Sequence, residues 1–315
     1  ARKAAESFAD RDFREIAIAE FYYFTGQAQK CSDLVEIYIM SSRLELKLSA
    51  CMLYVYSNLT LGNAKASGRG LEIIRECLRK EMEAPTSERN TAYCVFAGYM
   101  GTVLLHLSTE KLPDMKKYMS SLPQGLRIFA ANVISHDLYL KGEYSRALGI
   151  CDAALFSCKE IYPVGMIYLY CVTAMCEISL KNPAEAEKAI LTAWKLAVKD
   201  ELIEPFIELH GLLQGLLESC IRKENPEMYR KISDAVITFS RGWMAVHNPA
   251  SDNPVTDALT TMEFSIAMLA CRDWSNREIA EHIGVSLNTV KHYLTDIFNK
   301  LHVKKRDELK NFVLK

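Results

Sequence analysis

Apolar residues recur every three to four positions along most of the chain, from about residue 4 to residue 242. This spacing is typical of helices that bury one face. The breaker residues Gly (14) and Pro (9) are scarce among 315 residues and fall singly between long stretches. Because strands joined by tight turns need frequent breakers, the pattern argues against β structure and predicts an all-α chain.

The breaks between these stretches are nearly periodic. Gly26, Gly62 and Gly142 each precede a new apolar segment, and Asn-Pro at 182–183 opens a fourth. The intervals are 36, 80 and 40 residues, and a further break at 108–113 lies near the middle of the longest interval. A period of about 34 to 47 residues made of paired helices is typical of tetratricopeptide-like or HEAT-like repeats.

The segment from Gly142 to Leu148 resembles the turn of a tetratricopeptide repeat, although the Trp and paired Tyr of the full consensus are absent. We therefore expect residues 1–246 to form a tetratricopeptide-like helical solenoid, in which neighbouring helix pairs bury each other's apolar faces. Residues 247–254 hold two prolines and several turn formers, so they are predicted to be a linker. Residues 255–315 would then form a small second domain.

The small domain has the spacing of a helix-turn-helix. Thr260 with Glu263, and Ser275 with Glu278, fit capping boxes at the starts of two helices, expected at about 261–271 and 276–282. Two helices separated by a three-residue turn that contains a glycine are typical of a helix-turn-helix.

The turn and the third helix follow from the next residues. Gly284 can adopt the left-handed conformation that ends a helix. Ser286 is expected to cap a third helix that runs to about Leu301, and Asp307 to cap a short fourth one.

The third helix of this domain has two unlike faces. Its apolar positions are expected to face the core: Val290, Leu294, Ile297 and Leu301. Its polar positions form one stripe: Asn288, Lys291, His292, Thr295 and Asn299. Such side chains can hydrogen-bond to base edges and phosphates in a major groove, although an ordinary solvated helix has a similar mix.

Charge adds to this interpretation only locally. The whole chain has 38 Lys and Arg against 39 Asp and Glu, a net charge of −1, which excludes a protein that is basic throughout. From residue 286 to residue 315, seven basic residues stand against three acidic ones. Any surface that binds DNA is therefore expected at the C-terminal end.

The C-terminal segment resembles the LuxR-type (GerE) helix-turn-helix family. The resemblance rests on SNREIA at 275–280, VS at 285–286, NTVK at 288–291, KL at 300–301 and the later Arg306. It extends over some fifty-five residues in the correct order, with three departures. Met262 stands where the family has Arg, Asp-Trp at 273–274 replaces Gly-Leu or Gly-Lys, and Tyr293 takes the position of the family's His.

The resemblance implies DNA contacts for eleven side chains. Asn276 and Arg277 would contact phosphates, Lys291, His292 and Thr295 would face the bases, and Lys304 and Arg306 would lie near the DNA backbone. The full set is Ser275, Asn276, Arg277, Ser286, Asn288, Thr289, Lys291, His292, Thr295, Lys304 and Arg306. Arg306 could instead brace the last helix. That helix would pair two copies on DNA through Leu309, Phe312 and Val313.

Repeats of paired helices before such a domain resemble the C-terminal half of MalT-like regulators, in which a helical superhelix receives an inducer. The resemblance implies a small-molecule or peptide effector. Polar and aromatic side chains of the repeats are candidates for lining its groove: Tyr99, Asn132, His136, Tyr168, His210 and Gln214. The alternative for each is a packing role inside the core.

Other function classes find no support in the chain. It contains no G-x-x-x-x-G-K-[ST] phosphate loop, no nucleophile elbow and no metal-ligand spacing, so we expect no enzyme, cofactor or bound metal. Ten scattered cysteines without a C-x-x-C pair favour reduced thiols in the cytoplasm. No apolar run is long enough to cross a membrane.

The sequence therefore predicts a bacterial transcription regulator, in which an array receives an effector or partner and a helix-turn-helix binds promoter DNA. The alternative is a scaffold whose array recruits a partner protein while the small domain has little DNA binding of its own.

Overall fold

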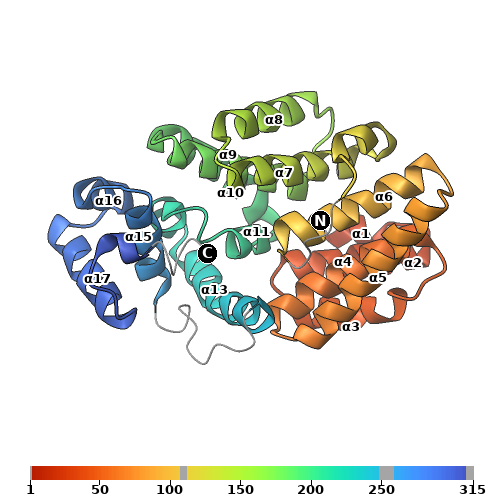
Figure 1. Ribbon diagram of the computed structural model, residues 1–315, viewed down its shortest axis with the longest axis horizontal. Helices are drawn as coiled ribbons and strands as arrows, with labels where there is room; N and C mark the ends of the chain where they lie inside the picture. The colour runs from red at the N-terminus through yellow and green to blue at the C-terminus, as the bar shows by residue number, and fades with distance from the viewer. Residues whose placement is uncertain (1, 107–111, 248–258, 310–315) are drawn as a thin grey trace.

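The computed structural model of the chain describes residues 2–106, 112–247 and 259–309. Within these ranges the secondary structure is helical and no strand occurs. The expected all-α fold, with helix pairs followed by a helix-turn-helix, is confirmed (Figure 1). Most of the break expected at 108–113 and most of the linker expected at 247–254 lie outside the described residues.

The first half of the array consists of consecutive α-helices and three short 3-10 or π-helical segments. They are α1 (Arg2–Glu6), α2 (Arg11–Phe24), α3 (Ala28–Val35), η1 (Glu36–Tyr38), α4 (Leu44–Thr60), α5 (Ala64–Glu83), α6 (Glu88–Tyr99), the π-helical η2 (Met100–Leu104) and the 3-10 helix η3 (Met115–Ser121). The second half contains α7 (Gln124–Leu140), α8 (Tyr144–Ser157), α9 (Pro163–Ser179), α10 (Pro183–Ala197), η4 (Val198–Asp200), α11 (Glu204–Glu208), η5 (Leu217–Ile221), α12 (Arg222–Glu224) and α13 (Pro226–His247).

The expected breaks are tight turns between the members of helix pairs. Gly26, Gly62 and Gly142 have φ angles of 75°, 69° and 75°, the left-handed region that ends a helix without steric cost in glycine. They separate α2 from α3, α4 from α5 and α7 from α8. At the fourth break Lys181 takes the left-handed conformation, with φ of 61°, and Pro183 begins α10. Each pair consequently packs as an antiparallel hairpin.

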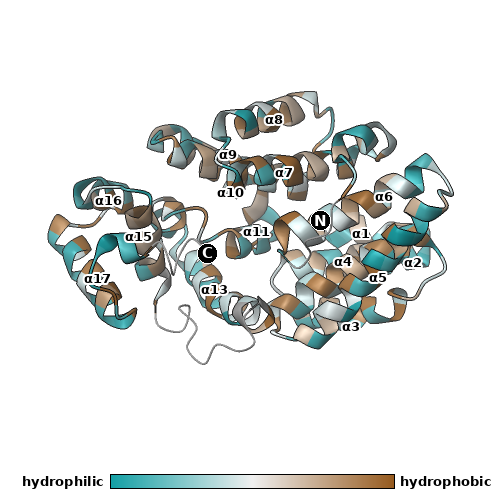
Figure 2. Ribbon diagram, in the orientation of Figure 1, coloured by the Kyte–Doolittle hydropathy of each residue, from teal (hydrophilic) through white to brown (hydrophobic). Residues whose placement is uncertain are grey.

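The pairs follow one another around a curved body (Figure 1). Helices on its outside, such as α5, are mostly hydrophilic, whereas α7, which packs between α8 and α9, is much more hydrophobic (Figure 2). Burial of these apolar faces between neighbours is the main stabilising contribution in such arrays.

The last helices of the array depart from a plain solenoid. Helix α11 contacts α2 and α9, and α13 crosses back to pack on α4. Their approach is close, because a Cβ atom added at Gly242 of α13 would lie 2.2 Å from the carbonyl oxygen of Leu59. The inner side of the curve is therefore occupied by α11 and α13.

The C-terminal domain contains α15 (Thr261–Cys271), α16 (Asn276–Ile283), α17 (Leu287–Lys300) and η6 (Arg306–Leu309). It lies at one end of the array (Figure 1). Its helix α15 contacts α13, and α16 contacts η5. Its buried side chains belong to the same continuous hydrophobic cluster as those of the array.

Candidate nucleic-acid interface

Local capping sets the first two helices of the C-terminal domain. The Thr260 hydroxyl accepts from the backbone N–H of Glu263, and the Glu263 carboxylate accepts in return from the N–H of Thr260 at 2.7 Å. Ser275 and Glu278 form the same reciprocal pair. Both expected capping boxes are present, and each such cap stabilises its helix by about 1 kcal/mol.

The turn before the third helix follows the sequence pattern as well. Gly284 has a φ of 75° and ends α16, and the Ser286 hydroxyl accepts from the N–H of Thr289 at 3.0 Å. Helix α17 begins at Leu287, one residue after this cap. The short turn fixes the direction in which α17 leaves α16.

Helix α17 has one buried and one exposed face. Val290, Leu294 and Ile297 are buried against α15 and α16. The side chains of the polar stripe are exposed: Asn288, Lys291, His292, Thr295 and Asn299. No hydrogen bond or ion pair involves the ammonium group of Lys291 or the ring of His292 in the described part of the chain. The ammonium group of Lys291 and the ring of His292 are therefore accessible to a ligand.

An ion pair ties α17 to α15. Lys300 Nζ lies 2.7 Å from both carboxylate oxygens of Glu263, whose side chain is 6% exposed. Burial alone would raise the pKa of Glu263, but the hydrogen bonds from Lys300 and Thr260 hold it below its usual range. This pair, which the sequence pattern does not predict, ties the last residue of α17 to the first turn of α15.

The other expected DNA contacts differ in their accessibility. Ser275, Arg277, Ser286 and Lys304 are exposed, whereas Asn276 and Thr289 are half-buried. Arg277 pairs with Glu281 one turn later, 3.1 Å from Nε to Oε1. An exposed pair of this kind contributes little free energy, so it leaves the guanidinium free to exchange partners.

The structure corrects the DNA contact that was expected for Arg306. Its guanidinium donates to the carbonyl oxygens of Ala270 and Trp274 and to Oδ1 of Asn276, 3.1 Å away. Burial lowers the pKa of this guanidinium below its usual range. The side chain ties η6 to the end of α15 and the start of α16, and it points into the domain rather than toward a phosphate.

The structure also changes the expectation for the dimerisation residues. Leu309 is fully buried within its own domain, so it cannot be a surface residue that meets a second copy. Phe312 and Val313 lie outside the described residues.

One guanidinium links the C-terminal domain to two helices of the array. Arg272 follows α15 and donates to Ser179 Oγ of α9 and to the Tyr139 hydroxyl of α7, both at 2.6 Å. Its guanidinium also lies 5.4 Å from the centroid of the Tyr139 ring, within the range of cation–π attraction.

A second contact involves the turn at 209–216, which follows α11. His282 of α16 donates from Nε2 to the carbonyl oxygen of Gln214 at 2.9 Å. A Cβ atom added at Gly215 would lie 2.2 Å from Cδ1 of Ile283, and one added at Gly211 would lie 2.5 Å from Cε1 of Phe264. The two glycines therefore let α15 and α16 approach the backbone of the array directly.

A buried polar cluster completes this interface. His210 Nε2 lies 2.9 Å from Glu218 Oε1, and the Ser265 hydroxyl of α15 donates to the same oxygen at 3.3 Å. Although burial opposes ionisation, His210 holds the pKa of Glu218 below its usual range. The array thus contacts α15 and α16, while α17 packs on these two helices and lies on the far side of the domain from the array (Figure 1).

The expected effector groove is wrong for five of its six residues. Tyr99 is half-buried, but the other five are at most 4% exposed and lie inside the packed array: Asn132, His136, Tyr168, His210 and Gln214. His210 and Gln214 do not form a helical pair, because they fall in the turn at 209–216. Burial lowers the pKa of His136 to about 4, so this imidazole is neutral at physiological pH. These side chains lie in the interior and do not line an open groove.

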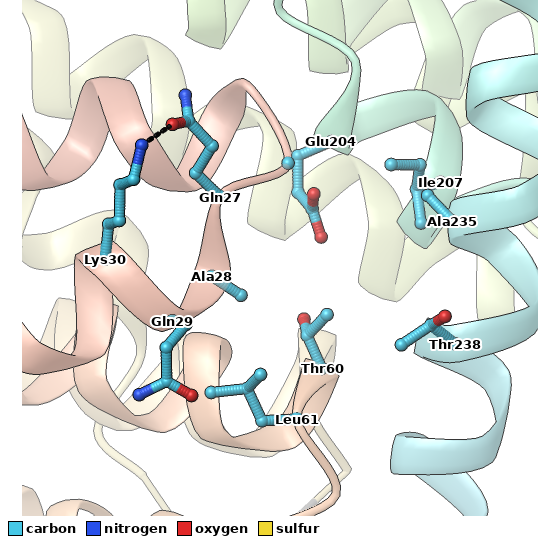
Figure 3. A pocket seen from close by; sticks show the side chains of 11 residues that line it. Gln27, Ala28, Gln29, Lys30, Thr60, Leu61, Glu204, Ile207, Ala235 and Thr238 are labelled. Atoms are coloured by element: carbon cyan, nitrogen blue, oxygen red, sulfur yellow. Dashed lines mark hydrogen bonds between the residues drawn. The ribbon is translucent and has the colours of Figure 1, made fainter.

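A cavity of about 410 Å³ opens elsewhere, between the α2–α3 turn, the end of α4, α11 and α13. The carboxyl group of Glu204 points into it (Figure 3). Sequence reasoning missed this site, because a glutamate on a short apolar segment gives no sign of which distant helices will surround it.

The comparisons with known proteins agree with the C-terminal geometry. Residues 257–313 match the family of bacterial regulatory proteins named luxR (GerE). The C-terminal segment is thus a LuxR-type helix-turn-helix domain, the kind of domain that DNA-binding transcriptional regulators carry. No solved structure matches the chain.

One curated relative adds a name of the same kind. The probable transcriptional regulatory protein SgaR of Hyphomicrobium methylovorum is 28% identical to this chain over 88 residues. The match covers 27% of this chain and 40% of that relative. No helix among the described residues combines the length and apolar character that crossing a bilayer requires.

Proposed function

We propose that this chain is a DNA-binding transcriptional regulator whose array receives an effector and holds the C-terminal domain with α17 directed outward. The observation that carries the proposal is the exposed polar stripe of α17, opposite a buried apolar face, on a helix that lies away from the array (Figure 1). A helix presented in this way fits a major groove, whose width admits one α-helix.

In this proposal the roles of the side chains follow their places on the domain. Lys291, His292 and Thr295 reach base edges from α17. Phosphates are contacted by side chains at the edges of the helix-turn-helix: Ser275, Arg277, Ser286 and Lys304, all of which are exposed. Asn288 and Thr289 lie at the start of α17, where backbone N–H groups also favour an anion.

The test is a salt titration of DNA binding by Lys291→Ala, on a duplex selected by the wild type from a random pool and on a scrambled duplex. If Lys291 reads a base, the substitution should cost about 1–3 kcal/mol on the selected duplex and much less on the scrambled one. If it only neutralises a phosphate, both duplexes should weaken alike, and the slope of log affinity against log salt should fall by about one.

The matched control is Lys195→Ala, since Lys195 is an exposed lysine of α10, outside the C-terminal domain. It should bind both duplexes like the wild type. If Lys291→Ala also binds both duplexes with wild-type affinity, α17 is not the recognition helix, and the scaffold interpretation of the chain becomes the better one.

Two copies are proposed to bind together on DNA. One helix-turn-helix contacts a single half-site, and a second copy on an inverted repeat gains affinity from its effective concentration. The pairing surface would have to come from residues after Leu309, such as Phe312 and Val313. Sedimentation of the protein with a duplex of one half-site and a duplex of two should give one and two bound chains. One chain on both duplexes would contradict pairing.

A further inference from the structure

The cavity beside Glu204 has a mixed lining. Its apolar surface comes from Ala28 at the start of α3, Leu61 after α4, Ile207 of α11 and Ala235 of α13. Figure 3 shows these side chains around a common space, with the Glu204 carboxyl group between them. Exposed residues at its rim, such as Thr238, leave it open to solvent.

One oxygen of the buried Glu204 carboxyl group has no hydrogen-bond partner among the described residues. The residue is 1% exposed, and its Oε1 is buried and accepts no hydrogen bond within the described residues. Burying a carboxyl oxygen without a donor costs free energy, so a donor that enters the cavity would be bound favourably.

The groups around Glu204 do not meet this need. Glu208, one turn later on α11, accepts from the hydroxyl groups of Tyr23 and Tyr168. Lys30, which also lines the cavity, donates from Nζ to Gln27 Oε1 at 2.8 Å and lies over the ring of Tyr22. Glu208 is thus satisfied by other groups and does not line the cavity, and the lining cation Lys30 is directed to other partners than Glu204.

We propose that this cavity binds a small organic molecule that carries a positively charged amine. The ammonium group donates to Glu204 Oε1, and the hydrocarbon part packs on Leu61, Ile207 and Ala235. This inference rests on the proposed function, because it assigns the effector site of the array.

The position of the cavity explains how an amine there acts on the C-terminal domain. Helix α11, which contributes Glu204 and Ile207, leads without a further helix into the turn at 209–216. That turn contacts α15 through Gly211 and α16 through Gln214 and Gly215. A ligand that draws α11 toward α3 and α13 changes the surface on which the domain is docked. By linkage, DNA must then change the affinity for the amine by the same factor.

The experiment uses the full chain and titration calorimetry. The probes are primary alkylamines of four to six carbons, with alcohols and carboxylates of the same chain length as controls. The amines should bind and raise the unfolding midpoint, and the alcohols and carboxylates should bind at least about tenfold more weakly. Equal binding of all three classes would overturn the assignment of an amine.

Two variants locate the binding. Glu204→Gln keeps the shape of the side chain but cannot ionise beside a bound ammonium group, so it should weaken amine binding at least about tenfold. Glu201→Gln is the matched control, since Glu201 is exposed and pairs with Lys231 outside the cavity. Ala235→Phe fills the cavity from α13 and should abolish binding even if Glu204→Gln folds poorly. Wild-type affinity in both cavity variants would overturn the site.

DNA binding measured in the same preparations separates the two proposals. The amine should change the DNA affinity of the wild type and not that of Glu204→Gln. Amine binding without any change in DNA affinity would overturn the role as effector. If Lys291→Ala loses DNA binding and keeps amine binding, both proposals are supported. A wild type that binds amine and no DNA would contradict the proposed function and not the site.

Discussion

Glu208 shows how burial sets the charge of a single residue. Its carboxyl group lies in the interior beside α2 and α9, and burial raises its pKa to about 7, although the hydroxyl groups of Tyr168 and Tyr23 oppose the shift by donating to it. The pKa of Glu204 is also raised well above its usual range, because it is buried and close to Glu208. Without a bound cation, both groups therefore stay protonated well above the pH at which an exposed glutamate ionises, and an ammonium group beside Glu204 would favour its ionised form.

This shift makes stability depend on pH. Because the folded pKa of Glu208 lies above its unfolded value, its contribution is fully present below about pH 4.5 and is lost as pH rises toward 7. The loss amounts to about 3 kcal/mol at most. Glu208→Gln should flatten the fall of unfolding free energy between pH 5 and pH 7, measured by urea denaturation. An identical pH profile in the variant would mean that Glu208 is ionised in the fold.

Arg306 and Lys304 are neighbours that should respond differently. Arg306→Ala leaves three acceptors without their donor, so it should destabilise the C-terminal domain by about 2–4 kcal/mol. Lys304→Ala removes an exposed charge and should leave stability unchanged while lowering the salt dependence of DNA binding by about one contact. Thermal unfolding and salt titration of both variants check this pair of expectations.

At the scale of elements, the sequence predicts what local chemistry decides. The starts of α15, α16 and α17 were predicted to the residue, because the hydroxyl and carboxylate groups of their caps act on the next few backbone N–H groups. The left-handed glycines between helix pairs were predictable for the same reason. Arg272, Glu204 and the turn at 209–216 were not, since their partners lie many residues away and only the packing of whole helices brings them together.

The glycine between α16 and α17 gives a test at this scale. Gly284→Ala places a Cβ in the left-handed region, which should cost about 1–2 kcal/mol, and no backbone atom crowds the added methyl group. Gly149→Ala is the matched control, since Gly149 lies inside α8 in open space and should gain up to about 1 kcal/mol. Changes in unfolding free energy, relative to the wild type, that have the same sign in both variants would contradict this account of the turn.

At the scale of the molecule, the array and the C-terminal domain share one hydrophobic cluster and several polar contacts. They should consequently unfold together, in one calorimetric transition. Arg272→Ala removes the donor to Ser179 and Tyr139 and should split this transition or broaden it. Arg127→Ala, an exposed arginine of α7, is the control and should not. Two transitions already in the wild type would show that the contacts are too weak to couple the two parts.

The close contacts at Gly211 and Gly215 limit which DNA-binding domains can dock on this array. Because Phe264 and Ile283 enter space that any side chain at those positions would occupy, the fit depends on residues from both parts at once. A chimera that joins this array to the DNA-binding domain of another regulator would dock only if the graft brings side chains of similar length to positions 264 and 283. Recombination between such regulators would therefore preserve the contact between array and DNA-binding domain when the segment from α11 onward is exchanged together with the C-terminal domain.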